Sequence, residues 1–280
     1  MEAHSRAFTL IDRITTVDPG VRIRGHYRIP PTLEKFPSSL VAEATGQLAG
    51  WAIMAAVDFK FRCLAGIAEK VELLADARPG QVLELAADIE TVGTDGCDYC
   101  GFASVNGRPL LRLIHCVGPM LPQEELEDVN AVRGLYLSLC SGDSGPSAFA
   151  GVPPLEVART GGETGQIAKG VLTAPTAAEF FADHFPRRAL FPATLLVNEL
   201  VNFVTDFANE ESAPGAGLTW VPRGLYGVKI RAFTKPGETL DIVAEVKKRE
   251  IDSLLISVEV RNGQRNAANL RMALVKEETG

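Results

Sequence analysis

The sequence lacks an excess of positive charge, a dense set of cysteines and an uninterrupted hydrophobic run. Its 28 lysines and arginines are outnumbered by 35 aspartates and glutamates, which gives a formal net charge of -7. Nucleic-acid-binding proteins usually present a basic face, so this balance argues against general nucleic-acid binding. The longest apolar run, residues 40–57, is interrupted by Glu43, Thr45 and Gln47. Because a membrane span needs about 20 mostly apolar residues, we interpret this run as a buried helix and expect no membrane association.

Cysteine is sparse, with five residues and therefore an odd number. This usage differs from the disulfide frameworks of small secreted proteins and suits a reducing compartment. Residues 1–14 mix charged side chains with short apolar runs and lack a signal-peptide pattern, so we expect a cytoplasmic protein. Cys97 and Cys100 form a CxxC pair, but no second pair and no helix follow it. We interpret them as two cysteines of one strand rather than a zinc or redox site, and expect no metal.

Three short motifs occur twice, in the same order and at nearly the same spacing of 155 to 157 residues. The pairs are Phe36-Pro37 and Phe191-Pro192, Arg78-Pro79-Gly80 and Lys235-Pro236-Gly237, and Asn106-Gly107 and Asn262-Gly263. Each motif alone is a common turn or loop sequence. Their shared order and constant offset predict an internal duplication of the chain.

Each copy contains the same succession of expected elements. The stretches 38–57 and 193–207 are apolar nearly all round and predict one long buried helix per copy. Segments rich in Val, Ile and Leu, separated by Pro-Gly and Asn-Gly turns, predict antiparallel strands. These strands are 7–14, 21–29, 67–74, 82–92, 99–105 and 110–117, then 155–160, 166–172, 226–233, 239–247, 254–260 and 269–275. The pattern predicts an α+β protein with two units.

The expected units are residues 1–125 and 151–280, and residues 126–150 form the expected linker between them. A helical piece is expected through Cys140. The Gly- and Ser-rich residues 141–147 then predict a flexible loop.

Two segments resemble parts of one known signature. Residues 183–193, Asp-His-Phe-Pro-Arg-Arg-Ala-Leu-Phe-Pro-Ala, are similar to the His-Phe-Pro…Pro-Gly motif of the FabA/FabZ-type 3-hydroxyacyl-acyl-carrier-protein dehydratases. Residues 36–47, Phe-Pro-Ser-Ser-Leu-Val-Ala-Glu-Ala-Thr-Gly-Gln, resemble the later part of this signature, with its catalytic acid and the following Gln. The resemblance covers nearly the whole chain, once per copy. It implies a double hotdog fold, in which each unit wraps a sheet around one long helix.

The two copies have lost different parts of the signature. The seventh residue before the repeated Phe-Pro is His184 in the second copy and Ile29 in the first. The seventh residue after the Phe is Glu43 in the first copy and Asn198 in the second. In dimeric members of the family, the histidine of one subunit faces the acid of the other. The resemblance therefore implies one composite site, with His184 as base and Glu43 as acid, and an inactive mirror site.

This pair suits the dehydration of a (3R)-hydroxyacyl thioester, so the expected enzyme is a hydro-lyase. A neutral histidine removes the α-proton and a carboxylic acid protonates the departing hydroxyl, each contributing roughly 10²–10⁴-fold. The resemblance implies that the remaining motif residues contact the substrate, and that backbone N–H groups at the helix start stabilise the enolate. These residues are Gln47, Phe185, Pro192, Ala193 and Thr194, with Ala193 standing where the family usually has Gly.

No metal or redox cofactor is expected, because the substrate arrives on the phosphopantetheine of an acyl carrier protein or of CoA. Arg187 and Arg188 flank the expected entrance. They would contact the phosphate or an acidic carrier protein, or they are solvated charges. Glu199, one residue past the motif position, is interpreted as a structural or solvated residue. His26 and His115 lie in expected strands and are interpreted as structural.

Two alternatives keep the fold and change the function. A thioesterase would use Glu43 to activate water for hydrolysis, whereas a non-catalytic acyl-carrier-binding protein would bind thioesters without turnover. Acyl chain length, a fatty-acid or polyketide-type pathway, and the oligomeric state stay open. The duplication is compatible with a monomeric pseudo-dimer or with a higher homo-oligomer.

Overall fold

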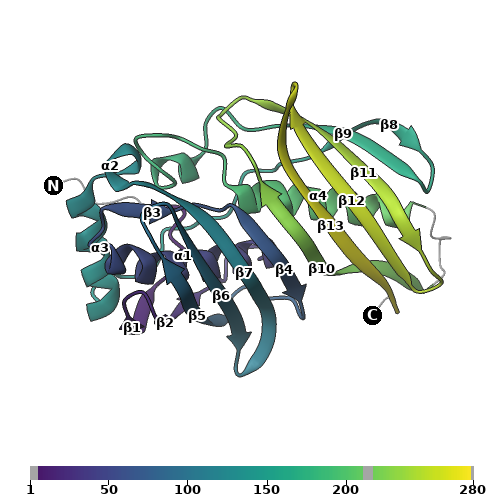
Figure 1. The fold of residues 1–280 in the computed structure, drawn as a ribbon. Coiled ribbons are helices and arrows are strands. Elements are labelled where there is room, and N and C mark those ends of the chain that lie inside the picture. Colours follow the sequence, from purple (N-terminus) through teal and green to yellow (C-terminus); the bar gives the residue numbers. More distant parts are fainter. Residues whose placement is uncertain (1–5, 211–216, 279–280) are drawn as a thin grey trace.

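The computed structural model describes residues 6–210 and 217–278. In this part of the chain, one antiparallel sheet curves past two long helices that lie behind it (Figure 1). The first copy holds α1 (Ser38–Ala56) and the strands β1 (Arg13–Asp18), β2 (Arg22–Arg28), β3 (Phe61–Cys63), β4 (Ile67–Leu73), β5 (Val82–Val92), β6 (Gly96–Val105) and β7 (Arg108–Pro122). The second copy holds α4 (Ala193–Asn209) and the strands β8 (Ala158–Glu163), β9 (Ile167–Thr173), β10 (Leu218–Ile230), β11 (Thr239–Arg249), β12 (Ser253–Asn262) and β13 (Arg265–Glu278).

The strand order reads the same from either edge of the sheet. It runs β1-β2-β5-β6-β7-β4 and continues β10-β13-β12-β11-β9-β8, with β3 paired to β7 beside this path. Each strand of the first half on this path therefore has its counterpart at the mirrored position of the second half, and β3 has none among the described residues. The two halves join where β4 pairs with β10, with Val71 opposite Leu225. The predicted duplication is thus an inverted repeat about a pseudo-twofold axis near this pair.

The two long helices begin at equivalent points of the repeat. Pro37 precedes α1 and Pro192 precedes α4. Proline has no N–H to donate and is tolerated at a helix start but not in its interior, so it fixes both start points. The observed helices agree closely with the expected stretches 38–57 and 193–207.

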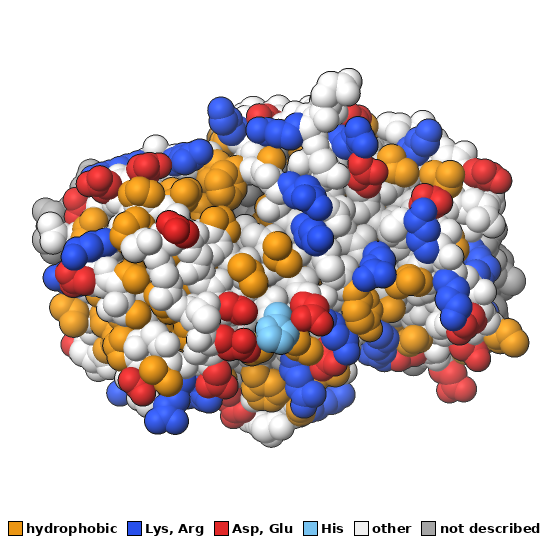
Figure 2. All heavy atoms as spheres, in the orientation of Figure 1, with side chains coloured by type: hydrophobic (Ala, Val, Ile, Leu, Met, Phe, Trp, Pro, Cys, Tyr) orange, Lys and Arg blue, Asp and Glu red, His pale blue; other side chains and the backbone are white. Residues whose placement is uncertain are grey.

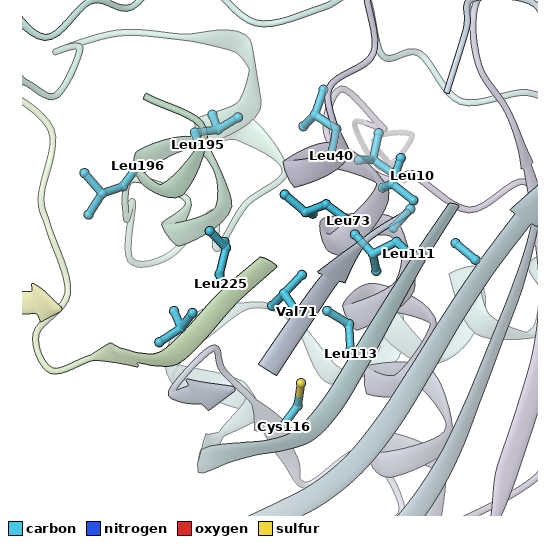
Figure 3. Packing of buried hydrophobic residues seen from close by; sticks show 14 of the residues in the cluster. Leu10, Leu40, Val71, Leu73, Leu111, Leu113, Cys116, Leu195, Leu196 and Leu225 are labelled. Atoms are coloured by element: carbon cyan, nitrogen blue, oxygen red, sulfur yellow. The ribbon is translucent and has the colours of Figure 1, made fainter. Parts of the chain in front are cut away.

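Apolar side chains of both copies form one continuous core between the helices and the sheet. Figure 3 labels members of this core from both halves, among them Leu40 of α1 and Val71 of β4 from the first, and Leu195 of α4 and Leu225 of β10 from the second. Full burial of a side chain such as leucine contributes about 1.5–3 kcal/mol. The apolar interior is therefore continuous across the junction of the two copies.

The first expected strand, residues 7–14, is wrong, because β1 begins only at Arg13. The backbone N–H of Phe8 donates to Asp183 Oδ2 at 2.7 Å, and that of Leu10 donates to Gln47 Oε1 at 2.8 Å. These bonds to side chains replace the ladder that a strand needs. The expected strand 226–233 is also too short, since β10 begins at Leu218 and accommodates Pro222 and its glycines with two register shifts.

Two shorter helices, α2 (Gln123–Leu126) and α3 (Val129–Ser141), follow the first copy. Helix α3 confirms the expected helical piece. The loop after it is not a free tether, since Arg6 Nη1 donates to the carbonyls of Ser144 and Gly145 at 2.7 Å each. The Ser147 hydroxyl also donates to Thr9 O at 2.6 Å. The division into units at residues 125 and 150 stays a prediction.

The outer face of the sheet carries charged side chains of both signs among apolar ones (Figure 2). Among the helices of the described residues, none combines the length and the apolar character that crossing a bilayer requires. The cytoplasmic location stays a prediction.

Candidate active site

A cavity of about 1050 Å³ lies between the two copies, bordered by α1, α4 and the strands at their junction. Most of its lining residues are apolar, which suits a fatty acyl chain. Glu43, Thr194 and His184 line it together. The structure thus brings the two residues of the predicted composite site to one cavity, although 140 positions of sequence separate them.

Glu43 lies in the second turn of α1 and receives hydrogen bonds from both copies. The Thr194 hydroxyl, at the start of α4, donates to Glu43 Oε2 at 2.6 Å. Gln47, one turn further along α1, donates from Nε2 to Glu43 Oε1 at 2.8 Å. Each carboxyl oxygen therefore has one fixed donor and keeps room for a second partner. The carboxyl group is oriented while it remains able to bind water or substrate.

Gln47 is itself held by the N-terminal segment. Its Nε2 donates a second bond to Phe8 O at 2.8 Å, and its Oε1 accepts from the N–H of Leu10 at 2.8 Å. Asp183 fixes this segment from the second copy, because its Oδ2 accepts from Phe8 N at 2.7 Å and from the Thr9 hydroxyl at 2.9 Å. Asp183, the neighbour of His184, therefore positions the acid side of the site through Phe8 and Gln47. The sequence motif contained Asp183 but gave no indication of this contact.

His184 follows a short 3-10 helix, η1 (Glu179–Ala182), and is partly buried. Its Nδ1 lies 3.0 Å from Leu190 O. A carbonyl oxygen can only accept, so Nδ1 carries the proton and Nε2 of the neutral ring is an acceptor. Burial lowers the pKa of His184, and the negative charge of Glu43 opposes this effect. The site therefore holds a neutral imidazole close to a carboxyl group.

Phe185 gives the loop its sharp turn. Its φ of 64° lies in the left-handed region, which is uncommon for a residue other than glycine and costs about 1–3 kcal/mol. Its buried ring packs with Leu64 and Leu126 of the first half and lies 4.0 Å from the His184 ring, centroid to centroid. Packing between the halves thus holds the strained residue beside the histidine. Phe185 supports the position of His184 and also lines the cavity.

The start of α4 offers two backbone donors. The N–H groups of Leu195 and Leu196 bond to Pro192 O at 3.1 and 3.2 Å. Ala193 and Thr194 come before them, so their N–H groups have no acceptor within the helix. Both residues line the cavity. The positive end of the helix dipole therefore meets the cavity beside Glu43.

The mirror position repeats the hydrogen bond between the helices, but asparagine and isoleucine stand there in place of Glu43 and His184. The Ser39 hydroxyl donates to Asn198 Oδ1 at 2.9 Å, as Thr194 does to Glu43. The fully buried Ile29 stands where the second copy has His184. Glu199 is 7% exposed, and its Oε1 accepts from Asn198 Nδ2 at 2.8 Å, while burial raises its pKa. Glu199 does not line the cavity, which fits a structural residue.

Arg187 and Arg188 bind the α2–α3 segment. Arg187 Nη1 donates to Glu124 O at 2.7 Å, and its Nη2 lies 3.6 Å from Asp128 Oδ2. Arg188 Nη1 lies 3.7 Å from Glu125 Oε2. Acidic residues therefore partly balance both charges, although about half of each arginine side chain is exposed. Their contact with a carrier protein stays a prediction.

A group of possible metal ligands lies outside the cavity. Among the described residues, Glu90, Asp98 and His115 place ligand atoms within 4.8 Å of one another, on β5, β6 and β7. None of the three lines the cavity. Figure 2 shows a histidine among acidic side chains on the outer face of the sheet. His115 Nδ1 lies 3.6 Å from Glu90 Oε2, which is the geometry of a surface ion pair.

No protein-family model and no curated protein sequence matches this chain. The fold does match solved structures. They include a putative oleoyl thioesterase from Lactobacillus plantarum, with 9% identity, 92% of this chain and 97% of that chain covered, and a TM-score of 0.59. The 12:0-ACP thioesterase from Umbellularia californica has 10% identity, with 91% and 94% covered and a TM-score of 0.56. A conserved protein with a hotdog fold from Alicyclobacillus acidocaldarius has 12% identity, with 98% of each chain covered and a TM-score of 0.52.

These likenesses show that the chain has the α+β double hotdog fold predicted from its sequence. They also correct the expected reaction class. The two of these structures that carry an enzyme name are thioesterases, which are hydrolases, and not dehydratases. The assignment as a hydro-lyase is therefore wrong, and the resemblance to the dehydratases is supported for the fold.

Proposed function

We propose that the protein is an acyl thioesterase with one composite active site between its two copies. The observation that supports this most directly is the 2.6 Å hydrogen bond from Thr194 of the second copy to Glu43 of the first. This bond orients the carboxylate of Glu43 in a largely apolar cavity that His184 also lines. The names of the similar hotdog structures support hydrolysis as the reaction class.

Glu43 is the general base in this proposal. A water molecule binds to the free side of its carboxylate and donates its second hydrogen to Nε2 of the neutral His184. As the water oxygen bonds to the thioester carbonyl carbon, its proton passes to Glu43. Proton transfer by a positioned group contributes roughly 10²–10⁴-fold. Gln47 and Thr194 keep the carboxylate pointed at the water by holding one oxygen each.

The N–H groups of Ala193 and Thr194 stabilise the negative charge that develops on the carbonyl oxygen. Removing one donor of such a pair typically costs about 10²–10³-fold in kcat. The C–S bond then breaks, and Glu43 returns its proton to the departing thiolate. The products are a free thiol and a carboxylic acid, which then loses its proton to solvent. One residue thus serves both proton transfers, and no cofactor takes part.

The substrate is an acyl group carried on the pantetheine of an acyl carrier protein or of CoA. The apolar wall of the cavity receives the acyl chain. Arg187 and Arg188, whose side chains are half exposed near the His184 loop, bind the phosphate or the carrier. A phosphate would compete for these arginines with the acidic residues that they contact in the free protein.

The test is a product analysis with saturated acyl-CoA and acyl-carrier-protein substrates of several chain lengths. The wild-type protein should release free thiol and fatty acid in equal amounts. Glu43→Gln keeps the shape of the side chain but cannot accept the proton, so it should lower kcat by about 10²–10⁴-fold. Asn198→Ala, at the mirror position, is the matched control and should leave kcat within about twofold of wild type.

Two results would contradict the proposal. Binding of the acyl substrates without release of thiol would indicate a carrier-binding protein rather than an enzyme. Full activity of Glu43→Gln would place the chemistry elsewhere in the molecule.

A further inference from the structure

Two cysteines lie in contact beside the cavity, and one of them, Cys63, lines it. Cys63 ends β3 and Cys97 lies at the start of β6, and their Sγ atoms are 2.6 Å apart. A disulfide has an S–S distance of about 2.05 Å. A shift of about 0.5 Å would therefore convert the contact into a covalent bond.

The two sulfurs differ in their exposure to the cavity. Cys97 is 2% exposed, whereas Cys63 is partly exposed and lines the cavity. Gly118 on β7 makes the space, because a side chain at this position would collide with Cys63 Sγ and with Leu64 O. A small reagent entering the cavity thus reaches Cys63 first, with Cys97 directly behind it.

The chemistry of the pair also favours bond formation. The hydrogen bond between the two sulfurs lowers the pKa of Cys97 and raises the pKa of Cys63, so one thiolate is stabilised by the other thiol. The thiolate is the nucleophile in disulfide formation. In contrast, burial raises the pKa of Cys116 to about 12 and also raises those of Cys100 and Cys140.

We propose that Cys63 and Cys97 form a redox-modification site, a dithiol that a peroxide converts into an intramolecular disulfide. The proton between the two sulfurs moves to Cys97, and the Cys63 thiolate attacks the peroxide to give a sulfenic acid. The hydroxide that leaves takes this proton from Cys97 and becomes one water. The Cys97 thiolate then attacks the Cys63 sulfur, the S–S bond forms, and hydroxide leaves and takes up a proton as a second water. Two thiols are oxidised and one peroxide is reduced, and a dithiol reductant reverses the change.

The site connects to the loop that holds His184. Arg62 precedes Cys63, and its guanidinium carbon lies 4.9 Å above the centre of the Phe185 ring. Leu64 follows Cys63 and packs against Phe185 and Leu190. Drawing Cys63 toward Cys97 therefore moves the two residues that support Phe185, the neighbour of His184. This link to activity rests on the proposed function, whereas the disulfide itself does not.

The experiment treats the purified full-length protein with hydrogen peroxide and maps its peptides with trypsin and chymotrypsin. Chymotrypsin cleaves after Tyr99 and so separates Cys97 from Cys100. The expected product is one cross-linked peptide pair containing Cys63 and Cys97, with two of the five thiols lost in denaturant. The melting temperature should rise by about 5 °C, because the bond closes a loop of the unfolded chain, and dithiothreitol should reverse the rise.

Cys63→Ser and Cys97→Ser should each abolish the cross-link and the shift in melting temperature, and Cys100→Ser should change neither. Circular dichroism confirms that each variant is folded. A bond between Cys97 and Cys100, or five thiols still reactive after peroxide treatment, would overturn the proposal. Because these readouts need no substrate, they hold or fail separately from thioesterase activity.

Discussion

The Thr194 hydroxyl donates to Glu43 Oε2 across the junction of the two copies, at 2.6 Å. Its counterpart at the mirror position joins Ser39 to Asn198 at 2.9 Å, so the same contact occurs once with a carboxyl acceptor and once with an amide. The pseudo-twofold arrangement thus supplies an internal control for the composite site, because each functional residue has a partner in an equivalent place.

Removing the Thr194 hydroxyl should impair catalysis more than folding. Thr194→Val keeps the shape of the side chain and removes the donor to Glu43, which leaves one carboxyl oxygen without its fixed partner. A hydrogen bond to a charged group is worth about 1.5–3 kcal/mol, which corresponds to a fall in kcat of roughly 10- to 100-fold. Thiol release by Thr194→Val and by Ser39→Ala, the mirror substitution, provides the measurement. An equal loss in both variants would contradict a single composite site.

Asp183 should act on the site from a distance. Asp183→Asn weakens the acceptor of Phe8 N–H and of the Thr9 hydroxyl, and therefore loosens the segment that orients Gln47. We expect the free energy of unfolding to fall by about 1–3 kcal/mol and kcat to fall about tenfold, with little change in KM. Urea unfolding and steady-state kinetics measure both effects. A purely structural role would lower stability while leaving kcat unchanged at a temperature where the variant is fully folded.

Both residues of the predicted composite site, Glu43 and His184, line one cavity, and their roles stay predictions. The repeat and both long helices could be predicted from the sequence. These features depend on local signals, such as the apolar stretches after Phe36-Pro37 and Phe191-Pro192 and the offset of 155 residues between them. The contacts of Phe8 and Leu10 with Asp183 and Gln47 had no such signal. They join segments up to 175 residues apart and depend on how the copies pack.

The predicted reaction class was wrong for a chemical reason. A neutral histidine and a carboxyl group are equally suited to removing a proton beside a thioester carbonyl and to activating water at that carbonyl. Residue types at motif positions therefore cannot separate dehydration from hydrolysis. Of the two contacts that orient Glu43, the one from Gln47 lies within α1, whereas the one from Thr194 is tertiary and became visible only in the fold.

Burial of His184 should make stability depend on pH. Its folded pKa is lowered from the ordinary value of 6.5, so below this value the unfolded chain takes up the proton first. The contribution of His184 to stability is complete above about pH 6.5 and is lost as the pH falls through the window below it. Urea unfolding between about pH 7.5 and about pH 5.5 should therefore show a steeper loss for wild type than for His184→Asn.

The pKa of His184 should also depend on the charge of Glu43. The carboxylate charge opposes the effect of burial on the imidazole, so Glu43→Gln should lower the pKa of His184 further. Imidazole signals followed by NMR across pH, assigned with His184→Asn, measure this shift directly. An unchanged His184 pKa in Glu43→Gln would mean that the two groups do not interact, and would remove the electrostatic basis of the composite site.

Restoring an acid at the mirror position should destabilise the protein without creating a second active site. Asn198→Asp removes the amide that donates to Glu199 and adds a second carboxyl group next to it. Burial already raises the pKa of Glu199, and a neighbouring like charge would raise it more. A carboxyl group with a raised folded pKa favours the folded state only while it is protonated, so the variant should lose stability as the pH rises from about 4 to about 7. Asn198→Ala lacks the added charge and serves as the control in unfolding measurements across that range.

Thiol release should not increase in Asn198→Asp, because Ile29 provides no imidazole at the mirror position. A gain in activity would show that a carboxylate alone can drive the reaction at this helix start.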